Sequence, residues 1–480
     1  MSARRERETI DVQAERAVVA AVRVPESRYD PADPFGELRA LAEQAGAVVV
    51  GELSQRLERP VAGTYMGVGK IEELKGLCER LDASVILFDH DLSPKQISKI
   101  EEMTGRKVLD RSELILDIFA GRATTHEAKL QVELAQLEYT YPRLRAMWDH
   151  LERIVGGSPG GVGTRGPGEQ QLEIDRRLVQ KRKLALQAEL REIQARKRRE
   201  VRARNVDHFT VGIVGYTNAG KSTLFNTLTA GGAYADNRLF ATLMTRTREW
   251  DLGGGLRVML SDTVGFVRDL PHNLIASFRA TLEEATHADL LLIVLDISDP
   301  AAELHLKTVH ETLDAIFEEV RHAEKRLKDG AQPAPEPRRV LLLNKVDQLK
   351  DNAELLVWTH KHPDAIPISA LPATDRWPSP SGAGAAPLRL GGQALADLVR
   401  DAARGEVREL AITVPLSDSK TIHTIENRAE VLDRSYADGT VTLTARIGLR
   451  QLDQLRSAGA RMAVQGELAQ TPRQGWGRRE

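Results

Sequence analysis

Residues 215–222, Gly-Tyr-Thr-Asn-Ala-Gly-Lys-Ser, fit the spacing GxxxxGK[ST] of a phosphate-binding loop. An apolar run at 209–214 precedes them and is typical of a buried strand, while 223–228 are typical of a helix start. Glycines let the backbone curl around a phosphate, and the amides of the loop and of the new helix point at the anion. Lys221 can place a charge at the β- and γ-phosphates, and Ser222 a hydroxyl on Mg²⁺. The competing interpretation is a glycine turn, which the complete match in this context disfavours. The predicted phosphate site comprises Gly215, Tyr216, Thr217, Asn218, Ala219, Gly220, Lys221, Ser222 and Thr223.

A second motif, Asp262-Thr263-Val264-Gly265, follows the strand-like residues 257–260. An aspartate at the end of a strand beside the phosphate loop can hold Mg²⁺ through water, and the Gly265 N–H can contact the γ-phosphate. Alone this motif is weak, and a turn is its ordinary interpretation. Because it follows a phosphate loop, we expect it to distinguish GTP from GDP.

A third motif, Asn344-Lys345-Val346-Asp347, follows the apolar strand 340–343 and indicates the base. The Asp347 carboxylate can accept two hydrogen bonds from the N1–H and N2–H₂ edge of guanine. Adenine lacks this donor pair, and hydrogen bonds to a charged group contribute about 1.5–3 kcal/mol each. Downstream, Ser369-Ala370 with Leu371 offers backbone groups to the guanine O6, a signal that counts only after the others.

A loop threonine between the first two motifs can complete the Mg²⁺ shell. Thr242 is the best candidate, and Thr245 and Thr247 compete with it because spacing alone does not decide. The metal ligands expected are therefore Ser222, Thr242 and, through water, Asp262. The segment expected to order around the nucleotide comprises Phe240, Ala241, Thr242, Leu243 and Met244.

The ordered set of motifs resembles the P-loop GTPases related to translation factors. Four further blocks, at 64–70, 108–111, 129–137 and 163–169, make the chain similar to the HflX family of ribosome-associated GTPases, over about residues 15–470. The resemblance implies GTP hydrolysis with GTP/GDP and Mg²⁺. It also implies binding to the 50S subunit and 70S ribosome, with rescue or splitting of stalled ribosomes. It further implies ribosomal RNA contacts by the glycine-rich loop 156–168, with Thr164, Arg165 and Gly166 as the candidates. Without the resemblance, a flexible linker is an equal interpretation of this loop.

Composition limits the remaining possibilities. The chain has 480 residues and a net charge of −2, so RNA contact must come from local basic patches. Its start is charged, it contains no apolar run of ~20 residues, and its only cysteine is Cys78. We therefore expect a cytoplasmic protein without a membrane span, and a monomer; peripheral membrane association stays open.

The expected fold class is multidomain α/β. A small N-terminal α/β domain spans 1–125, with its first ~15 residues disordered. An antiparallel helical hairpin spans 126–205, with a kink at Pro142, and its second helix is rich in Arg and Lys. A P-loop GTPase domain with a mostly parallel sheet spans 206–405, and a small C-terminal α+β domain with a basic tail spans 406–480.

Three further segments receive looser interpretations. Residues 321–339 and 371–392 are expected to be an inserted surface linker and a partly disordered insertion. The stretch 67–70, Gly-Val-Gly-Lys, is interpreted as a turn, with a second nucleotide site as the less favoured alternative.

The expected catalytic groups are Lys221, Thr242 and Gly265. Many GTPases place a water-orienting Gln directly after Gly265, but Phe266 occupies that position and cannot hydrogen-bond through its side chain. We therefore expect slow intrinsic turnover that a partner stimulates. Two alternatives stay open: a GTP-dependent switch for a non-ribosomal protein, and an RNA-remodelling ATPase. The chain departs from the family pattern in two places. Residues 244–246 differ just after Thr242, in the segment expected to order around the nucleotide, and Gln170 differs just after the glycine-rich loop.

Overall fold

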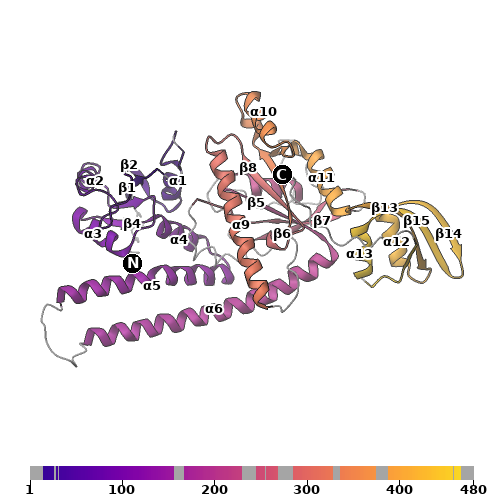
Figure 1. Cartoon of the computed structure of the whole chain (residues 1–480), viewed down its shortest axis with the longest axis horizontal. Coiled ribbons are helices and arrows are strands. Elements are labelled where there is room, and N and C mark those ends of the chain that lie inside the picture. The colour runs from indigo at the N-terminus through magenta and orange to yellow at the C-terminus, as the bar shows by residue number, and fades with distance from the viewer. Residues whose placement is uncertain are drawn as a thin grey trace, which may run out of the picture. The chain divides into compact units, whose positions relative to one another are not determined.

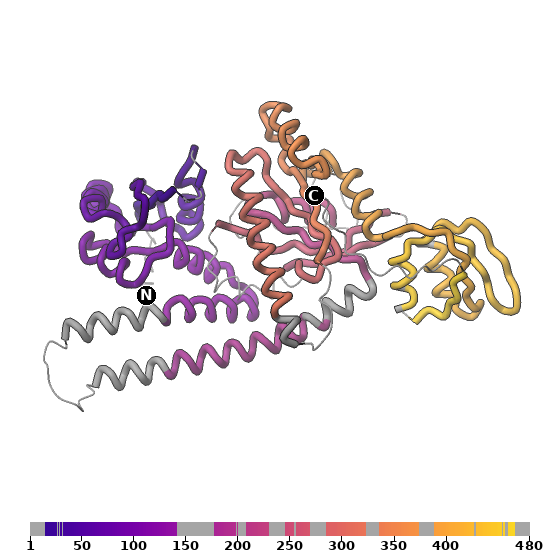
Figure 2. The backbone as a smooth tube through the Cα atoms, in the orientation of Figure 1, coloured from indigo at the N-terminus to yellow at the C-terminus, as the bar shows by residue number. Residues whose placement is uncertain are grey.

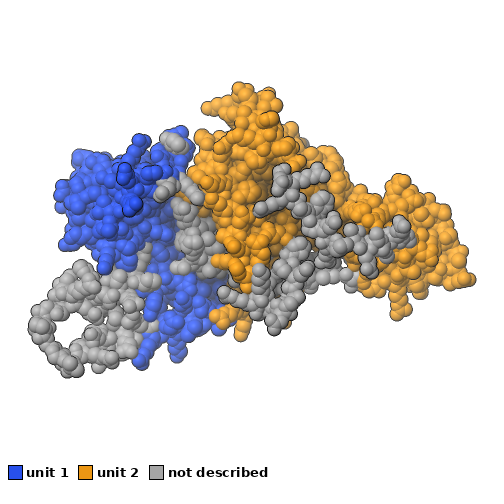
Figure 3. All heavy atoms as spheres, viewed as in Figure 1, with its two compact units in different colours: residues 1–190, 270–277 blue, residues 191–269, 278–480 orange. Residues whose placement is uncertain are grey.

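The structure is a computed structural model and describes most of the chain (Figure 2). The described residues are 15–25, 27, 29–30, 32–155, 167–229, 245–253, 256–268, 285–327, 336–373, 388–457 and 459–465. They divide into two compact units, residues 1–190 with 270–277 and residues 191–269 with 278–480, which are coloured separately in Figure 3. Among the described residues, no helix combines the length and apolar character that crossing a bilayer requires.

The first unit contains a parallel sheet with strand order β2-β1-β3-β4. Its strands are β1 (Arg16–Arg23), β2 (Val48–Arg56), β3 (Val85–Phe88) and β4 (Lys107–Leu109). Its shorter helices are α1 (Gly36–Gln44), α2 (Val68–Arg80), α3 (Pro94–Thr104) and α4 (Arg111–Arg122). Helix α3 begins with a capping box, in which Ser93 is the N-cap and Gln96 is the reciprocal partner. The alternation of strands and helices confirms the α/β class expected for this region.

A buried charge cluster lies at the carboxyl ends of these strands. Arg23, at the end of β1, donates to Asp89 at 2.9 Å, and Arg111, at the start of α4, donates to the other oxygen of Asp89 at 2.8 Å. Arg111 also pairs with Glu37 of α1 at 2.6 Å. Because Asp89 is buried, its negative charge depends on these two guanidinium groups for compensation.

Two long helices, α5 (His126–Val155) and α6 (Pro167–Asp207), form the predicted antiparallel hairpin (Figure 1). Side-chain pairs between α5 and α6 join early residues of α5 to late residues of α6, as an antiparallel arrangement requires. The pairs are His126–Glu189 at 2.6 Å, Glu133–Arg182 at 2.7 Å and Glu138–Lys183 at 2.9 Å. Two of the basic residues of α6 are thus engaged with α5, and Glu133 raises the pKa of the Arg182 guanidinium. Helix α5 is assigned as one helix through Pro142.

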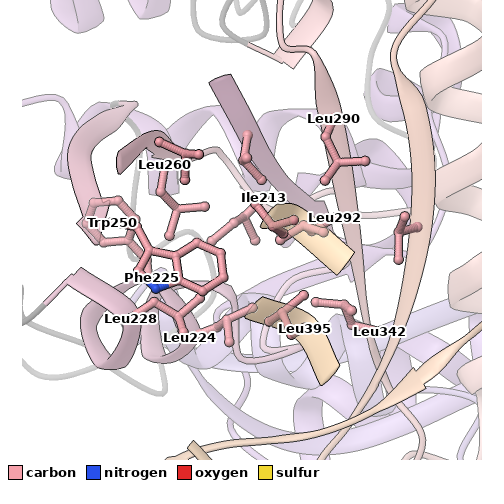
Figure 4. Packing of buried hydrophobic residues seen from close by; sticks show 14 of the residues in the cluster. Ile213, Leu224, Phe225, Leu228, Trp250, Leu260, Leu290, Leu292, Leu342 and Leu395 are labelled. Carbon is pink, nitrogen blue, oxygen red and sulfur yellow. The ribbon is translucent and has the colours of Figure 1, made fainter. Parts of the chain in front are cut away.

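The second unit contains a sheet with strand order β10-β9-β8-β5-β7-β6, parallel except for the edge strand β6. Its strands are β5 (Phe209–Gly215), β6 (Arg246–Asp251), β7 (Arg257–Asp262), β8 (Leu290–Asp296), β9 (Arg338–Asn344) and β10 (Ile366–Pro367). Its helices are α7 (Lys221–Thr229), α9 (Ala302–Leu327), the 3₁₀ helix η1 (Val346–Gln348), α10 (Asn352–Lys361) and α11 (Gly392–Arg404). Leu224 and Phe225 of α7 pack with Ile213, Trp250 and Leu260 of the sheet (Figure 4). This core fixes α7 on the strand that leads into the phosphate loop.

An antiparallel sheet with strand order β14-β15-β13-β16 follows in the same unit. It contains β13 (Val407–Pro415), β14 (Glu430–Ala437), β15 (Thr440–Gly448) and β16 (Ala463–Gln465), with helices α12 (Ser419–Arg428) and α13 (Leu449–Ser457). Arg450 of α13 pairs with Asp289 at 2.7 Å and lies over the Phe209 ring, 4.8 Å from its centroid. Asp289 also accepts from the Thr210 N–H at 2.9 Å, so the start of β5 is tied to α13.

One local prediction was wrong: residues 67–70 are not a turn, because α2 begins at Val68 with Gly67 as its N-cap. The predictions for 321–339 and 371–392 stay predictions, because residues 328–335 and 374–387 lie outside the described part of the chain. At the described ends of these stretches, residues 321–327 continue α9 and residues 338–339 begin β9. A short antiparallel ladder joins β11 (Ser369–Pro372) to β12 (Leu388–Leu390).

Candidate functional site

The phosphate loop lies between the end of β5 and the start of α7. Asn218 has φ +61° and Gly220 has φ +95°, so the chain reverses direction tightly before the helix begins. A Cβ on Gly220 would lie 2.3 Å from the Asn344 amide nitrogen, which is why this position requires glycine. The first amides of α7 have no partner within the helix, and they form a cradle for an anion.

Lys221, the first residue of α7, is buried and points back along the loop. Its Nζ donates to the Tyr216 carbonyl oxygen at 2.5 Å. Burial lowers the pKa of the Lys221 ammonium to about 8, against the raising influence of the Asp262 carboxylate. A bound phosphate adds negative charge beside the ammonium and therefore favours its protonated form.

The expected metal ligands Ser222 and Asp262 lie together. The Ser222 hydroxyl donates to an Asp262 carboxylate oxygen at 2.7 Å, and Asp262 is buried at the end of β7. Mg²⁺ prefers hard oxygen ligands and retains several of its waters. This pair of oxygen groups therefore fits Mg²⁺, which Ser222 and Asp262 would hold. The third expected ligand, Thr242, lies outside the described residues, as do Phe240, Ala241, Leu243 and Met244.

The loop Thr263-Val264-Gly265 lies against the phosphate loop. The Thr263 hydroxyl donates to the Ile213 carbonyl oxygen at 2.7 Å. A Cβ on Gly265 would lie 2.9 Å from the Lys221 Nζ, so this glycine directly borders the lysine head group. Phe266 is buried, and its N–H donates to the Gly215 carbonyl oxygen at 3.0 Å. Its aromatic ring therefore belongs to the packing of the domain.

Asn344 joins the base-recognition motif to the phosphate loop. Its Nδ2 donates to the Ala219 carbonyl oxygen at 2.7 Å, and its Oδ1 accepts from the Ala370 N–H at 3.0 Å. Ala370 follows the buried Ser369 and precedes the exposed Leu371 in β11. One buried side chain thus holds three of the predicted nucleotide-binding segments together: the phosphate loop, the Asn344 motif and Ser369-Ala370.

The other members of the Asn344 motif face outward. Lys345 has φ +62° and its Nζ pairs with Asp296 at 2.6 Å. Val346 and Asp347 lie in η1, where Asp347 is exposed. The Asp347 carboxylate is thus exposed three residues beyond Asn344, the residue that contacts the phosphate loop, and it stays the group predicted to recognise guanine.

Other sequence candidates have different outcomes. Thr164, Arg165 and Gly166 lie outside the described residues. Thr247, a competitor of Thr242, lies in β6 with its hydroxyl 3.0 Å from that of Ser261. Arg246 and Arg248 belong to β6, which pairs with β7.

Two contacts of Tyr216 could not be found from the sequence. Its ring stacks on that of His305 from α9, with centroids 3.9 Å apart and an interplanar angle of 15°. Its hydroxyl accepts from the Arg268 N–H at 2.9 Å. His305 lies 89 positions beyond Tyr216 outside any nucleotide-binding motif, so no local pattern reveals the contact.

The fold and the joined phosphate and base segments define a P-loop GTPase. Three family models match the chain: "GTP-binding GTPase N-terminal" at residues 32–120, "GTP-binding GTPase Middle Region" at 122–204 and "50S ribosome-binding GTPase" at 210–345.

Curated relatives identify the family. GTPase HflX of Magnetococcus marinus is 38% identical over 431 residues, which is 89% of this chain and 91% of that protein. GTPase HflX of Lacrimispora saccharolytica is 47% identical over 62% of this chain and 70% of that protein, and that of Escherichia coli is 42% identical over 66% and 70%. The chain belongs to the HflX family of GTPases and is a GTP-hydrolysing enzyme. A solved structure titled as an SsGBP and GDP complex is 26% identical, with a TM-score of 0.40, over 74% of this chain and 93% of that one.

Proposed function

We propose that this protein is a Mg²⁺-dependent GTPase that the large ribosomal subunit stimulates and that acts on the 50S particle or the 70S ribosome. The observation behind the proposal is Phe266, which is buried and hydrogen-bonded through its backbone to the phosphate loop. No side-chain donor or acceptor at this position orients the attacking water, so the catalytic group must come from elsewhere. The description of the matching family model, a 50S ribosome-binding GTPase, favours the ribosome as its source.

The proposed cycle needs a GTP-bound state that binds the ribosome and a GDP-bound state that leaves it. Gly265 borders Lys221, which supports its N–H as the group that responds to a γ-phosphate. Ser222, Thr242 and Asp262 are the proposed Mg²⁺ ligands. The glycine-rich loop 156–168, with Thr164, Arg165 and Gly166, is the proposed RNA contact, and the outcome of binding is rescue or splitting of stalled ribosomes.

Co-sedimentation tests the binding half of this proposal. The protein is mixed with 50S or 30S subunits and either a nonhydrolysable GTP analogue or GDP. We expect it to pellet with 50S in the analogue and to stay in solution with GDP. Lys221→Ala should abolish the nucleotide dependence, whereas Lys350→Ala, which changes an exposed lysine beyond the base motif, should not. Equal pelleting in both nucleotides, or none with 50S, would contradict the proposal.

Light scattering of 70S ribosomes tests the splitting function separately. Addition of the protein with the GTP analogue should lower the scattered intensity as subunits separate. Arg165→Ala should weaken this effect while leaving GDP affinity unchanged, because the proposed RNA contact is separate from the nucleotide site. If the protein binds 50S subunits but leaves 70S particles intact, the ribosome remains the partner and the splitting function is contradicted.

A further inference from the structure

We infer that Tyr216 is a positioning residue for GTP hydrolysis: it pins the downstream end of the loop 263–265 to the phosphate loop, and His305 holds its ring in place. The inference rests on the GTPase activity and is independent of the ribosome. The tyrosine lies at the second position of the GxxxxGK[ST] motif, where the motif itself specifies no residue type.

Both ends of the loop are fixed to the strand that leads into the phosphate loop. Upstream, Asp262 pairs with Ile213 in the parallel ladder between β5 and β7. Downstream, an isolated parallel bridge joins Phe266 to Tyr216. In this bridge the Phe266 N–H donates to Gly215 at 3.0 Å, and the Thr217 N–H donates to Phe266 at 2.8 Å. Only three residues span the two attachments, so the loop has little freedom.

The side chain of Tyr216 strengthens the downstream attachment. Its hydroxyl accepts from the Arg268 N–H at 2.9 Å, two residues beyond the backbone bridge. The ring is buried and stacks on His305, with centroids 3.9 Å apart. Since His305 belongs to α9, this helix also restrains the ring. The backbone of Gly215 and Thr217 and the hydroxyl of Tyr216 together therefore fix residues 266–268.

The consequence falls on Gly265, the last residue before this attachment. A Cβ on Gly265 would lie 2.9 Å from Lys221 Nζ and 2.9 Å from Thr217 Cγ2, so its backbone already borders the phosphate loop. Its N–H is the group expected to meet the γ-phosphate, which GDP lacks. Loosening the attachment should therefore weaken GTP binding and slow hydrolysis without weakening GDP binding.

Tyr216→Phe tests this directly because it removes the hydroxyl and keeps the ring and its stacking. Equilibrium fluorescence titration gives the affinities for GDP and for a nonhydrolysable GTP analogue, and single-turnover hydrolysis is measured without ribosomes. The net value of one neutral hydrogen bond predicts about fivefold weaker binding of the analogue, with GDP affinity changed less than about twofold. The hydrolysis rate should fall by a similar factor.

Three further variants separate positioning from stability. Thr413→Val removes a hydroxyl pair with Thr442 at 2.9 Å in the C-terminal sheet and should leave both affinities unchanged. His305→Ala should reproduce the loss of analogue affinity, and His305→Phe, which keeps an aromatic ring, should restore most of it. Equal weakening of GDP and analogue in Tyr216→Phe would mean a merely structural role and would overturn the inference, as would no change in either.

Discussion

Replacing Asn344 should damage both folding stability and nucleotide binding, because this side chain satisfies two buried backbone groups at once. Asn344→Ala leaves the Ala219 carbonyl and the Ala370 N–H without the partners they have at 2.7 and 3.0 Å. An unsatisfied buried group costs about 1–3 kcal/mol, so the variant should lose roughly 2–5 kcal/mol of unfolding free energy. The phosphate loop and β11 also lose their shared support, and GDP affinity should fall at least about thirtyfold.

Asn344→Asp separates the two contacts. It keeps an acceptor for the Ala370 N–H but turns an oxygen toward the Ala219 carbonyl, which repels it. GDP affinity should therefore fall as in Asn344→Ala even though shape is preserved. Urea denaturation followed by circular dichroism measures stability, and fluorescent GDP titration measures affinity. Lys350→Ala, at an exposed position beyond η1, serves as the control. Wild-type affinity in Asn344→Asp would refute the reasoning that the amide donor supports the phosphate loop.

Three other outcomes follow from the contacts described above. GDP affinity should be constant below pH 8 and should fall by up to about tenfold per pH unit above pH 8. The reason is that Lys221 has a pKa of about 8 in the free protein, and bound phosphates raise this pKa in the complex. Calorimetry in two buffers should detect the proton uptake linked to GDP binding. Gly265→Ala should slow GTP hydrolysis at least about tenfold with GDP affinity retained, because its Cβ would lie 2.9 Å from the lysine Nζ; stopped-flow phosphate release measures this. Asp89→Asn should destabilise the first unit by about 3–5 kcal/mol in urea unfolding, because two buried arginines lose their shared counter-ion. An unchanged GDP affinity above pH 8 would contradict the role of Lys221. An unchanged hydrolysis rate would contradict the role of Gly265, and an unchanged unfolding free energy would contradict that of Asp89.

The elements around the nucleotide motifs were predictable because each motif is contiguous with a strand or helix. The phosphate loop follows β5 and opens α7, and Asn344 ends β9. Apolar runs locate such buried strands, and loop chemistry locates the ends that meet the ligand. The C-terminal hairpin was predictable because Asp438-Gly439 is a typical two-residue turn, here between β14 and β15.

Contacts between distant residues could not be predicted. Strand β6 is an edge strand with mostly exposed side chains, so its sequence has no strong apolar pattern, and only pairing with β7 gives it order. The salt bridge between Lys345 and Asp296 and the stack of Tyr216 on His305 depend on how β8 and α9 pack. Local sequence propensity does not predict contacts between distant residues, although these contacts position the site residues as much as the motifs do.

GTP hydrolysis with and without purified 50S subunits tests the central claim most directly. Initial phosphate release is measured at saturating GTP for the wild type and for Lys221→Ala as the inactive control. The account predicts slow release alone, strong acceleration by 50S, and no acceleration in the variant. Equal rates with and without 50S would contradict it and leave a GTPase whose missing catalytic group comes from another partner.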